Sequence, residues 1–167
     1  FLAAAGTAFA FDYEPRNYHQ DFGNGELNAW SSYPPVQDTA YEAPFIYPGK
    51  ALPGDTGISL CKILYPQTAN EQMLGAVRKL ALRLDADSRI RFRYCVKATV
   101  APAWLGVDLP LADGNRILAR FPAPSLNRWI EADYRLADLF AASETPPCDT
   151  IDMTALAITV GFESADP

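Results

Sequence analysis

Residues 28–42 (NAWSSYPPVQDTAYE) combine large rings with carboxylates, and their side chains are the ones best suited to a chemical role. Trp and Tyr rings pack against the apolar C–H faces of sugars, and carboxylates and amides bond the hydroxyl groups around those faces. The composition therefore predicts a carbohydrate-binding surface made of Trp30, Tyr33, Gln37, Asp38, Tyr41 and Glu42.

The same segment also has a purely structural interpretation. Its rings would close one end of a core, and the Asp38 carboxylate would accept hydrogen bonds from backbone amides after Pro34-Pro35. A long loop needs such anchors to be ordered, so we favour this structural role over sugar binding.

The single histidine is the natural candidate for acid–base chemistry. His19 lies beside Tyr18 and near Arg16, and these groups could abstract a proton from a sugar carbon. Such catalysis needs groups that converge from separate elements, whereas these three are adjacent in one loop. The sequence also lacks G-x-S-x-G, H-E-x-x-H and P-loop motifs. We therefore expect no catalytic residue; the alternative is a small lyase or hydrolase that uses His19, Tyr18 and Arg16.

Five carboxylates in loops and near the chain ends are oxygen ligands of the kind that calcium prefers: Asp12, Glu14, Asp38, Glu42 and Asp152. Their spacing matches no EF-hand loop. Solvated carboxylates explain them better, so we expect no cofactor, with a structural calcium ion as the alternative.

A row of basic residues occupies alternate positions of 89–100 (RIRFRYCVKATV), and it consists of Arg89, Arg91, Arg93 and Lys97. Charge at alternate strand positions usually marks a solvated face. On an acidic protein a local cationic row can instead bind a uronic acid polymer. Both interpretations remain open at this stage.

Hydrophobic periodicity predicts the elements that carry these residues. In 89–100, Ile90, Phe92 and Tyr94 begin a strictly alternating apolar face, which indicates a strand with one buried side. Residues 56–66 alternate less cleanly, which indicates a central strand buried on both faces. Apolar residues also alternate in 79–85, 104–109, 116–121, 130–136 and 156–162.

These seven strands predict an all-β fold, an antiparallel β-sandwich of jelly-roll type. Residues 11–50 hold many rings but little periodicity, so we expect an irregular, aromatic-rich N-terminal arm there. Two short segments, 70–77 and 136–143, are helical candidates, too short for the crossovers of a parallel sheet. Trp104 and Trp129 are out of phase with the apolar faces; we expect them on an outer surface, against a sugar or under the arm.

Charge and length exclude several classes of partner. The chain carries 14 basic and 20 acidic groups, a net charge of −6, which argues against nucleic acid. No stretch approaches the ~18 apolar residues of a membrane-spanning helix. The length of 167 residues fits a single domain, which we place at 11–167.

Residues 1–10 (FLAAAGTAFA) read either as the remnant of a signal peptide, with Ala8-Phe9-Ala10 before the cleavage site, or as an apolar or disordered arm. Cys61, Cys95 and Cys148 fit no zinc or redox pattern, and both a disulfide and buried thiols remain open.

Several of these stretches resemble the N-terminal β-sandwich of secreted bacterial polysaccharide lyases of the heparinase II/III-like group. The similar segments are 28–42, 89–100, 109–122, 127–140 and 151–167. The overall plan is also similar to the galactose-binding-like jelly rolls that serve as carbohydrate-binding modules.

The resemblance implies a secreted or periplasmic module that binds glycan or supports an adjacent catalytic domain of a larger chain. In such lyases the catalytic Tyr, His and Arg belong to the α/α-toroid and the sheet domain behind it, so none is carried over to this sequence.

Overall fold

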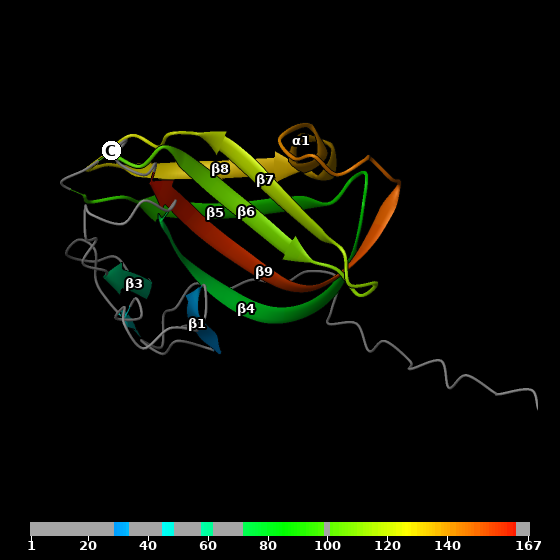
Figure 1. Cartoon of the computed structure of the whole chain (residues 1–167), viewed down its shortest axis with the longest axis horizontal. Helices are drawn as coiled ribbons and strands as arrows, with labels where there is room; N and C mark the ends of the chain where they lie inside the picture. The colour runs from blue at the N-terminus through cyan, green and yellow to red at the C-terminus, as the bar shows by residue number, and fades with distance from the viewer. Residues whose placement is uncertain (1–28, 34–44, 49–57, 62–71, 99–100, 163–167) are drawn as a thin grey trace, which may run out of the picture.

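The structure is a computed structural model that describes residues 29–33, 45–48, 58–61, 72–98 and 101–162 (Figure 1). Every pair of strands within its sheets is antiparallel, so the all-β prediction is confirmed. The main sheet has the order β1-β4-β9-β6-β7, with bounds Trp30–Tyr33, Gln72–Asp85, Thr150–Phe162, Trp104–Pro110 and Arg116–Pro122.

Two smaller sheets accompany the main sheet. Strands β5 (Arg89–Cys95) and β8 (Trp129–Arg135) form one of them. Strands β2 (Phe45–Pro48) and β3 (Ile58–Cys61) form the other.

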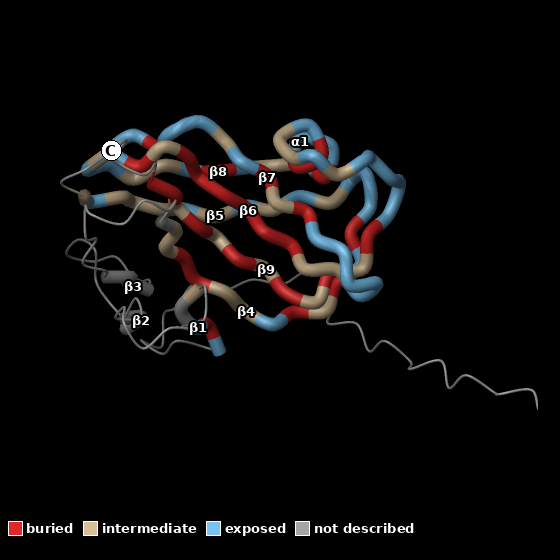
Figure 2. The backbone as a smooth tube through the Cα atoms, viewed as in Figure 1, coloured by how far each residue is buried: buried red, intermediate tan, exposed pale blue. Residues whose placement is uncertain are grey.

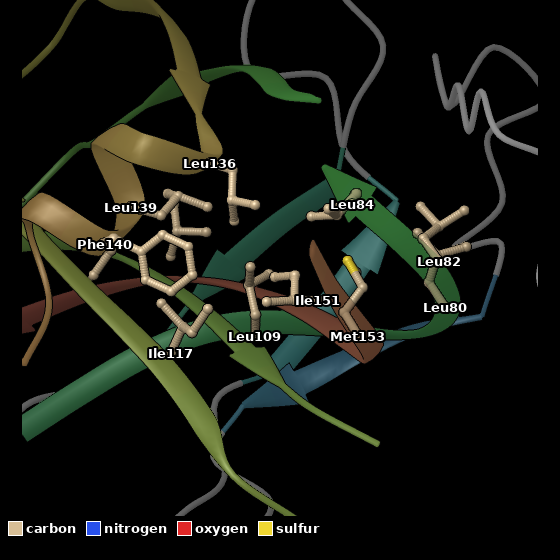
Figure 3. Packing of buried hydrophobic residues seen from close by; sticks show 12 residues of the cluster. Leu80, Leu82, Leu84, Leu109, Ile117, Leu136, Leu139, Phe140, Ile151 and Met153 are labelled. Atoms are coloured by element: carbon tan, nitrogen blue, oxygen red, sulfur yellow. The ribbon is translucent and has the colours of Figure 1, made fainter. Parts of the chain in front are cut away.

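The hydrophobic core lies between the main sheet and the layer made by β5, β8 and helix α1 (Leu136–Ala141) (Figure 3). Val107, Leu109 and Ile117 of the main sheet are fully buried there. Ile90 and Phe92 of β5 pack against this cluster from the opposite layer. Each fully buried aliphatic side chain contributes about 1.5–3 kcal/mol, so this interface holds the two layers together.

An aromatic stack also joins the layers. Phe121 of β7 lies parallel to Tyr134 of β8, with ring centroids 3.8 Å apart, and Phe92 of β5 is tilted against Tyr134. The apolar face predicted for 89–100 therefore does point into the sandwich.

Helix α1 forms where the alternation of β8 stops. Leu136, Leu139 and Phe140 follow the spacing of one helical face and are buried in the core. The Arg135 backbone N–H donates to the Asp138 carboxylate at 2.8 Å, which satisfies a donor at the start of the helix. The helix predicted in 136–143 is therefore confirmed.

Two other predictions about elements were wrong. The described part of the helix predicted in 70–77, residues 72–77, is the start of β4, because it pairs with β9 and, from Gly75 onward, also with β1. Pairing on both edges overrides the weak helical preference of the segment. The strand in 56–66 is not central: its described part, β3, pairs with β2 outside the main sheet. An apolar run indicates a strand but not the sheet that it joins.

The region expected to be an irregular arm contributes the short strands β1 and β2, which sequence alternation alone did not reveal. The central strand of the main sheet is β9, and it starts at Thr150, six residues before the predicted segment. Buried residues run along β6 and β9 through the middle of the sheet (Figure 2).

The register of β9 shifts by one residue along its length. Its pairing with β4 changes between Lys79 and Leu82. Its pairing with β6 changes as well, from Asp108 opposite Ala157 to Leu111 opposite Met153. The alternation therefore changes phase, which is the effect of a β-bulge.

Because of this change, Met153 and Ile158 both face the core: Met153 belongs to the core cluster, and Ile158 lies opposite the core residue Val107. Thr159 consequently faces the other side of the main sheet.

Candidate functional site

The face of the main sheet that points away from the core, here called the outer face, carries the candidate site. One row crosses all five strands on this face, in the order Tyr33, Gly75, Thr159, Gly106 and Arg120. The two ends of the row are large side chains and its middle is small. The row therefore forms a low floor between two walls.

Trp104 lies across this floor. A Cβ atom at Gly106 would be 2.7 Å from the Cζ3 atom of the indole, and one at Gly161 would overlap the ring. The Arg120 guanidinium covers the other side, 4.7 Å from the ring centroid. Trp104 is only 8% exposed. The expected outer position of Trp104 is confirmed, but the ring is sandwiched between glycines and a guanidinium.

Asp108 is the centre of a polar cluster on the same face. Its side chain is fully buried, and it pairs with Arg116 through two bonds, Nε to Oδ1 at 2.7 Å and Nη2 to Oδ2 at 2.8 Å. The Tyr33 hydroxyl donates to Asp108 Oδ2 at 2.6 Å and accepts a longer bond from Arg116 Nη2 at 3.3 Å. A buried carboxylate needs such partners, because an unpaired charge is costly in a protein interior.

Burial, followed by the hydrogen bond to Asp108, raises the pKa of Tyr33 to about 12. Its phenol is therefore a neutral donor across the physiological range. The guanidinium of Arg116 also has a raised pKa, chiefly because it donates to Asp108.

An open groove of about 660 Å³ runs beside this cluster. Its walls are Arg116, Leu118 and Arg120 of β7 and residues 141–145 after helix α1. Two bonds hold that segment to β7: Arg120 N–H donates to Ala142 O at 2.7 Å, and Thr145 Oγ1 donates to Arg116 O at 3.1 Å. Each guanidinium in the groove also has a partner beneath it: Asp108 for Arg116, and the Trp104 ring for Arg120.

The cationic row lies on a different surface, the outer face of β5 and β8. Carboxylates of β8 stand opposite it: Asp133 accepts from Arg89 at 2.8 Å and from Arg91 at 3.1 Å. Glu131 lies 3.6 Å from Arg93. All of these side chains are more than a third exposed, so the row forms part of a solvated, mixed-charge face.

The remaining predicted sugar-binding residues are spread over several surfaces. Trp30 is buried on the core side of β1, opposite Arg78, and does not share a face with Tyr33. Trp129 is half-buried at one end of β8, with Arg93 5.3 Å from its ring centroid. Lys97 is exposed after β5. Gln37, Asp38, Tyr41 and Glu42 lie outside the described residues.

The catalytic alternative also lies outside the described residues, since it rests on Arg16, Tyr18 and His19. Among the carboxylates considered for calcium, Asp12 and Glu14 are likewise outside, and Asp152 pairs with Arg83 at 2.7 Å. Within the described part of the chain, no three His, Cys, Asp or Glu residues gather as a metal site would require.

Sequence reasoning missed Asp108, Arg116 and Arg120. The available signals were a single carboxylate within the apolar run LGVDLP, and glycines at 106 and 161 that leave space for a large neighbour. The contact between Asp108 and Tyr33 spans 75 positions, which no local pattern reveals.

Comparison of the chain with protein-family models, curated proteins and solved structures gave no match. The helices in the described residues include none with the length and apolar character needed to cross a bilayer.

Proposed function

We propose that this chain is a non-catalytic, glycan-binding module of an exported carbohydrate-active protein of the polysaccharide lyase type. The groove along β7 is the proposed binding surface. Its parent protein, its export and a jelly-roll topology related to galactose-binding domains belong to the same proposal, and the sequence resemblance supports them.

The observation that carries the proposal is the pair of immobilised guanidiniums in an open groove. Arg116 is fixed by two bonds to a buried carboxylate, and Arg120 lies over an indole. Guanidiniums held in this way have lost rotamer freedom before a ligand arrives, so binding orders fewer side chains. Leu118 adds an apolar wall between them.

Two guanidiniums and one carboxylate, that of Glu144, line the groove, and this balance favours an acidic sugar. A guanidinium presents a planar fork that matches a carboxylate, so a uronic acid residue fits the proposed site. The cationic row on β5 is the weaker candidate, because its arginines and their carboxylate partners are all exposed and are therefore not held in place before a ligand binds.

Affinity electrophoresis in gels that contain polygalacturonate, alginate or a neutral galactan tests this proposal. We expect retardation by at least one acidic polymer. Because hydrogen bonds to charged groups contribute about 1.5–3 kcal/mol, Arg120→Ala should weaken binding roughly tenfold or more.

Arg83→Ala is the control for the loss of one arginine from the main sheet, since Arg83 pairs with Asp152, as Arg116 does with Asp108, but lies away from the groove, on β4. This control should bind like the wild type. Binding lost through Arg91→Ser and kept in Arg120→Ala would move the site to the cationic row. Absence of any glycan binding would favour a module that only supports a neighbouring domain.

The lyase alternative is tested on the same polymers. Release of unsaturated uronate, followed by its ultraviolet absorbance and abolished by His19→Ala, would replace the binding module with an enzyme.

A further inference from the structure

The cluster of Asp108, Arg116 and Tyr33 has the hydrogen-bonding pattern of a hydroxyl-binding site. Asp108 offers an acceptor and Arg116 a donor at the same point, and one hydroxyl occupies both. That hydroxyl belongs to Tyr33, which donates to Asp108 Oδ2 and accepts from Arg116 Nη2. A sugar hydroxyl has the same capacity to donate and accept.

Tyr33 reaches this point along the outer face from β1, the strand at one edge of the main sheet. Strands β4 and β9 separate β1 from β6, so the ring must extend above the low floor to meet Asp108. Gly75 and Thr159 occupy the Tyr33 row on these two strands. Tyr33 belongs to a four-residue edge strand, the kind of element that opens most easily in a sheet.

A second observation also points to a ligand in this floor. Thr159 is 1% exposed, and in the part of the chain that the structure describes its Oγ1 atom has no hydrogen-bond partner. A buried hydroxyl without a partner is unfavourable by about 1–3 kcal/mol, and native proteins seldom keep one without a reason.

The cluster is continuous with the groove, because Arg116 belongs to both. A ligand lying along β7 therefore has one end beside the Tyr33 hydroxyl. Asp108 itself is completely covered, so a ligand hydroxyl can reach it only where the phenol now stands.

We infer that Asp108 and Arg116 form a hydroxyl-binding subsite for a pyranose at the end of the groove, and that the Tyr33 hydroxyl fills this subsite as an internal competitor. This inference rests on the proposed function for the class of its ligand. A ligand hydroxyl replaces the phenol hydroxyl on the same two partners, and the Thr159 hydroxyl, one row away, gains a partner beneath the sugar.

The first test is Tyr33→Phe, which removes the competing hydroxyl and keeps the ring. Titration calorimetry with polygalacturonate should show affinity about threefold to tenfold higher than in the wild type, the range expected for one hydrogen bond. Asp108→Asn in the Tyr33→Phe background should abolish the gain. Thr159→Val, a near-isosteric change that removes only the hydroxyl, should reduce it.

A second measurement does not depend on the polymer. The Arg116 Nε–H resonance is followed by NMR while methyl β-galactoside is added to the wild type and to Tyr33→Phe. The inference predicts a larger, saturable shift in the variant, and no such shift for the Arg83 Nε–H resonance.

The outcomes separate the two proposals. Polymer binding that stays equal or weakens in Tyr33→Phe overturns this inference and leaves the proposed function standing. An Arg116 shift without polymer binding supports the subsite and overturns the wider function. If neither polymer binding nor an Arg116 shift is observed, the inference and the proposed function are both overturned.

Discussion

The outer face of the main sheet and the outer face of the β5-β8 sheet both carry arginines and carboxylates, but the two faces use them differently. On β5 and β8, arginines alternate with apolar residues and face exposed carboxylates across the strand pair. On the main sheet, Asp108 and Arg116 meet beside a floor of small residues, and the carboxylate is fully buried with Tyr33 and Arg116 both bonded to it. In this protein the row of charges lies on a solvated surface, whereas the single carboxylate inside a buried strand is held by specific partners, Arg116 and Tyr33.

Two Arg–Asp pairs make this comparison quantitative. Arg116–Asp108 and Arg83–Asp152 have the same bond lengths, 2.7 and 2.8 Å, but the Asp108 side chain is 0% exposed and the Asp152 side chain 33%. The burial of Asp108, together with its additional bond from Tyr33, should separate the two pairs in stability measurements.

The largest effect is expected from Asp108→Ala. Removing one partner of a buried pair is typically destabilising by about 3–5 kcal/mol, and the half-exposed Arg116 places this variant near the lower end, at about 3 kcal/mol. Asp152→Ala should lower the free energy of unfolding by less than about 1 kcal/mol. Urea denaturation of both variants measures the difference. Equal losses of stability in the two variants would contradict the distinction between the buried pair and the solvated pair.

Gly161→Ala should have the next largest effect, about 2 kcal/mol, because the added methyl group overlaps the Trp104 ring. The variant Trp104→Leu, which removes that ring, provides the control. In thermal denaturation the double variant should be more stable than the sum of the two single changes predicts. Additive losses would show that Trp104 does not lie on the glycine floor.

Alkaline pH should weaken the fold through Tyr33. Its folded-state pKa of about 12 exceeds the usual value of about 10, so the stabilisation is complete below pH ~10 and is lost as the pH rises towards 12. Tyr94 and Tyr134, whose pKa values burial also raises, contribute in the same direction. The Tyr33→Phe variant should therefore lose stability less steeply over this interval. Identical slopes in chemical denaturation would contradict the buried phenol.

The smallest effect is expected on the solvated face. Arg91→Ala removes one of two arginines that share Asp133, and it should change the free energy of unfolding by less than about 0.5 kcal/mol. The melting temperature measures this change. A loss as large as that of Asp108→Ala would show that the two outer faces are equivalent.

The sequence predicted the strands and their phase well because alternation is a local property. The alternation in 89–100 correctly predicted which face of β5 points into the core. The position of Trp104, out of phase with its apolar neighbours, correctly predicted that this residue lies on the outer face. The partners of Trp104 and Tyr33 depend instead on the strand order β1-β4-β9-β6-β7, which brings distant segments into one row. No spacing in the chain indicates that order. The buried position of Trp30 agrees with the structural role favoured for the rings of 28–42, although a four-residue strand is too short for its periodicity to show which face each ring occupies.

The change of phase in β9 gives this strand an unusual sensitivity to chain length. Deleting one residue between Met153 and Leu156 would rotate everything after it by half a turn about the strand axis. Ile158 would then point to the outer face of the main sheet, and the Thr159 hydroxyl would point into the hydrophobic core. Single-residue insertions and deletions in this short window should be far more harmful than substitutions there. The number of residues between Met153 and Leu156 sets which side chains of β9 face the core, and a substitution leaves that number unchanged.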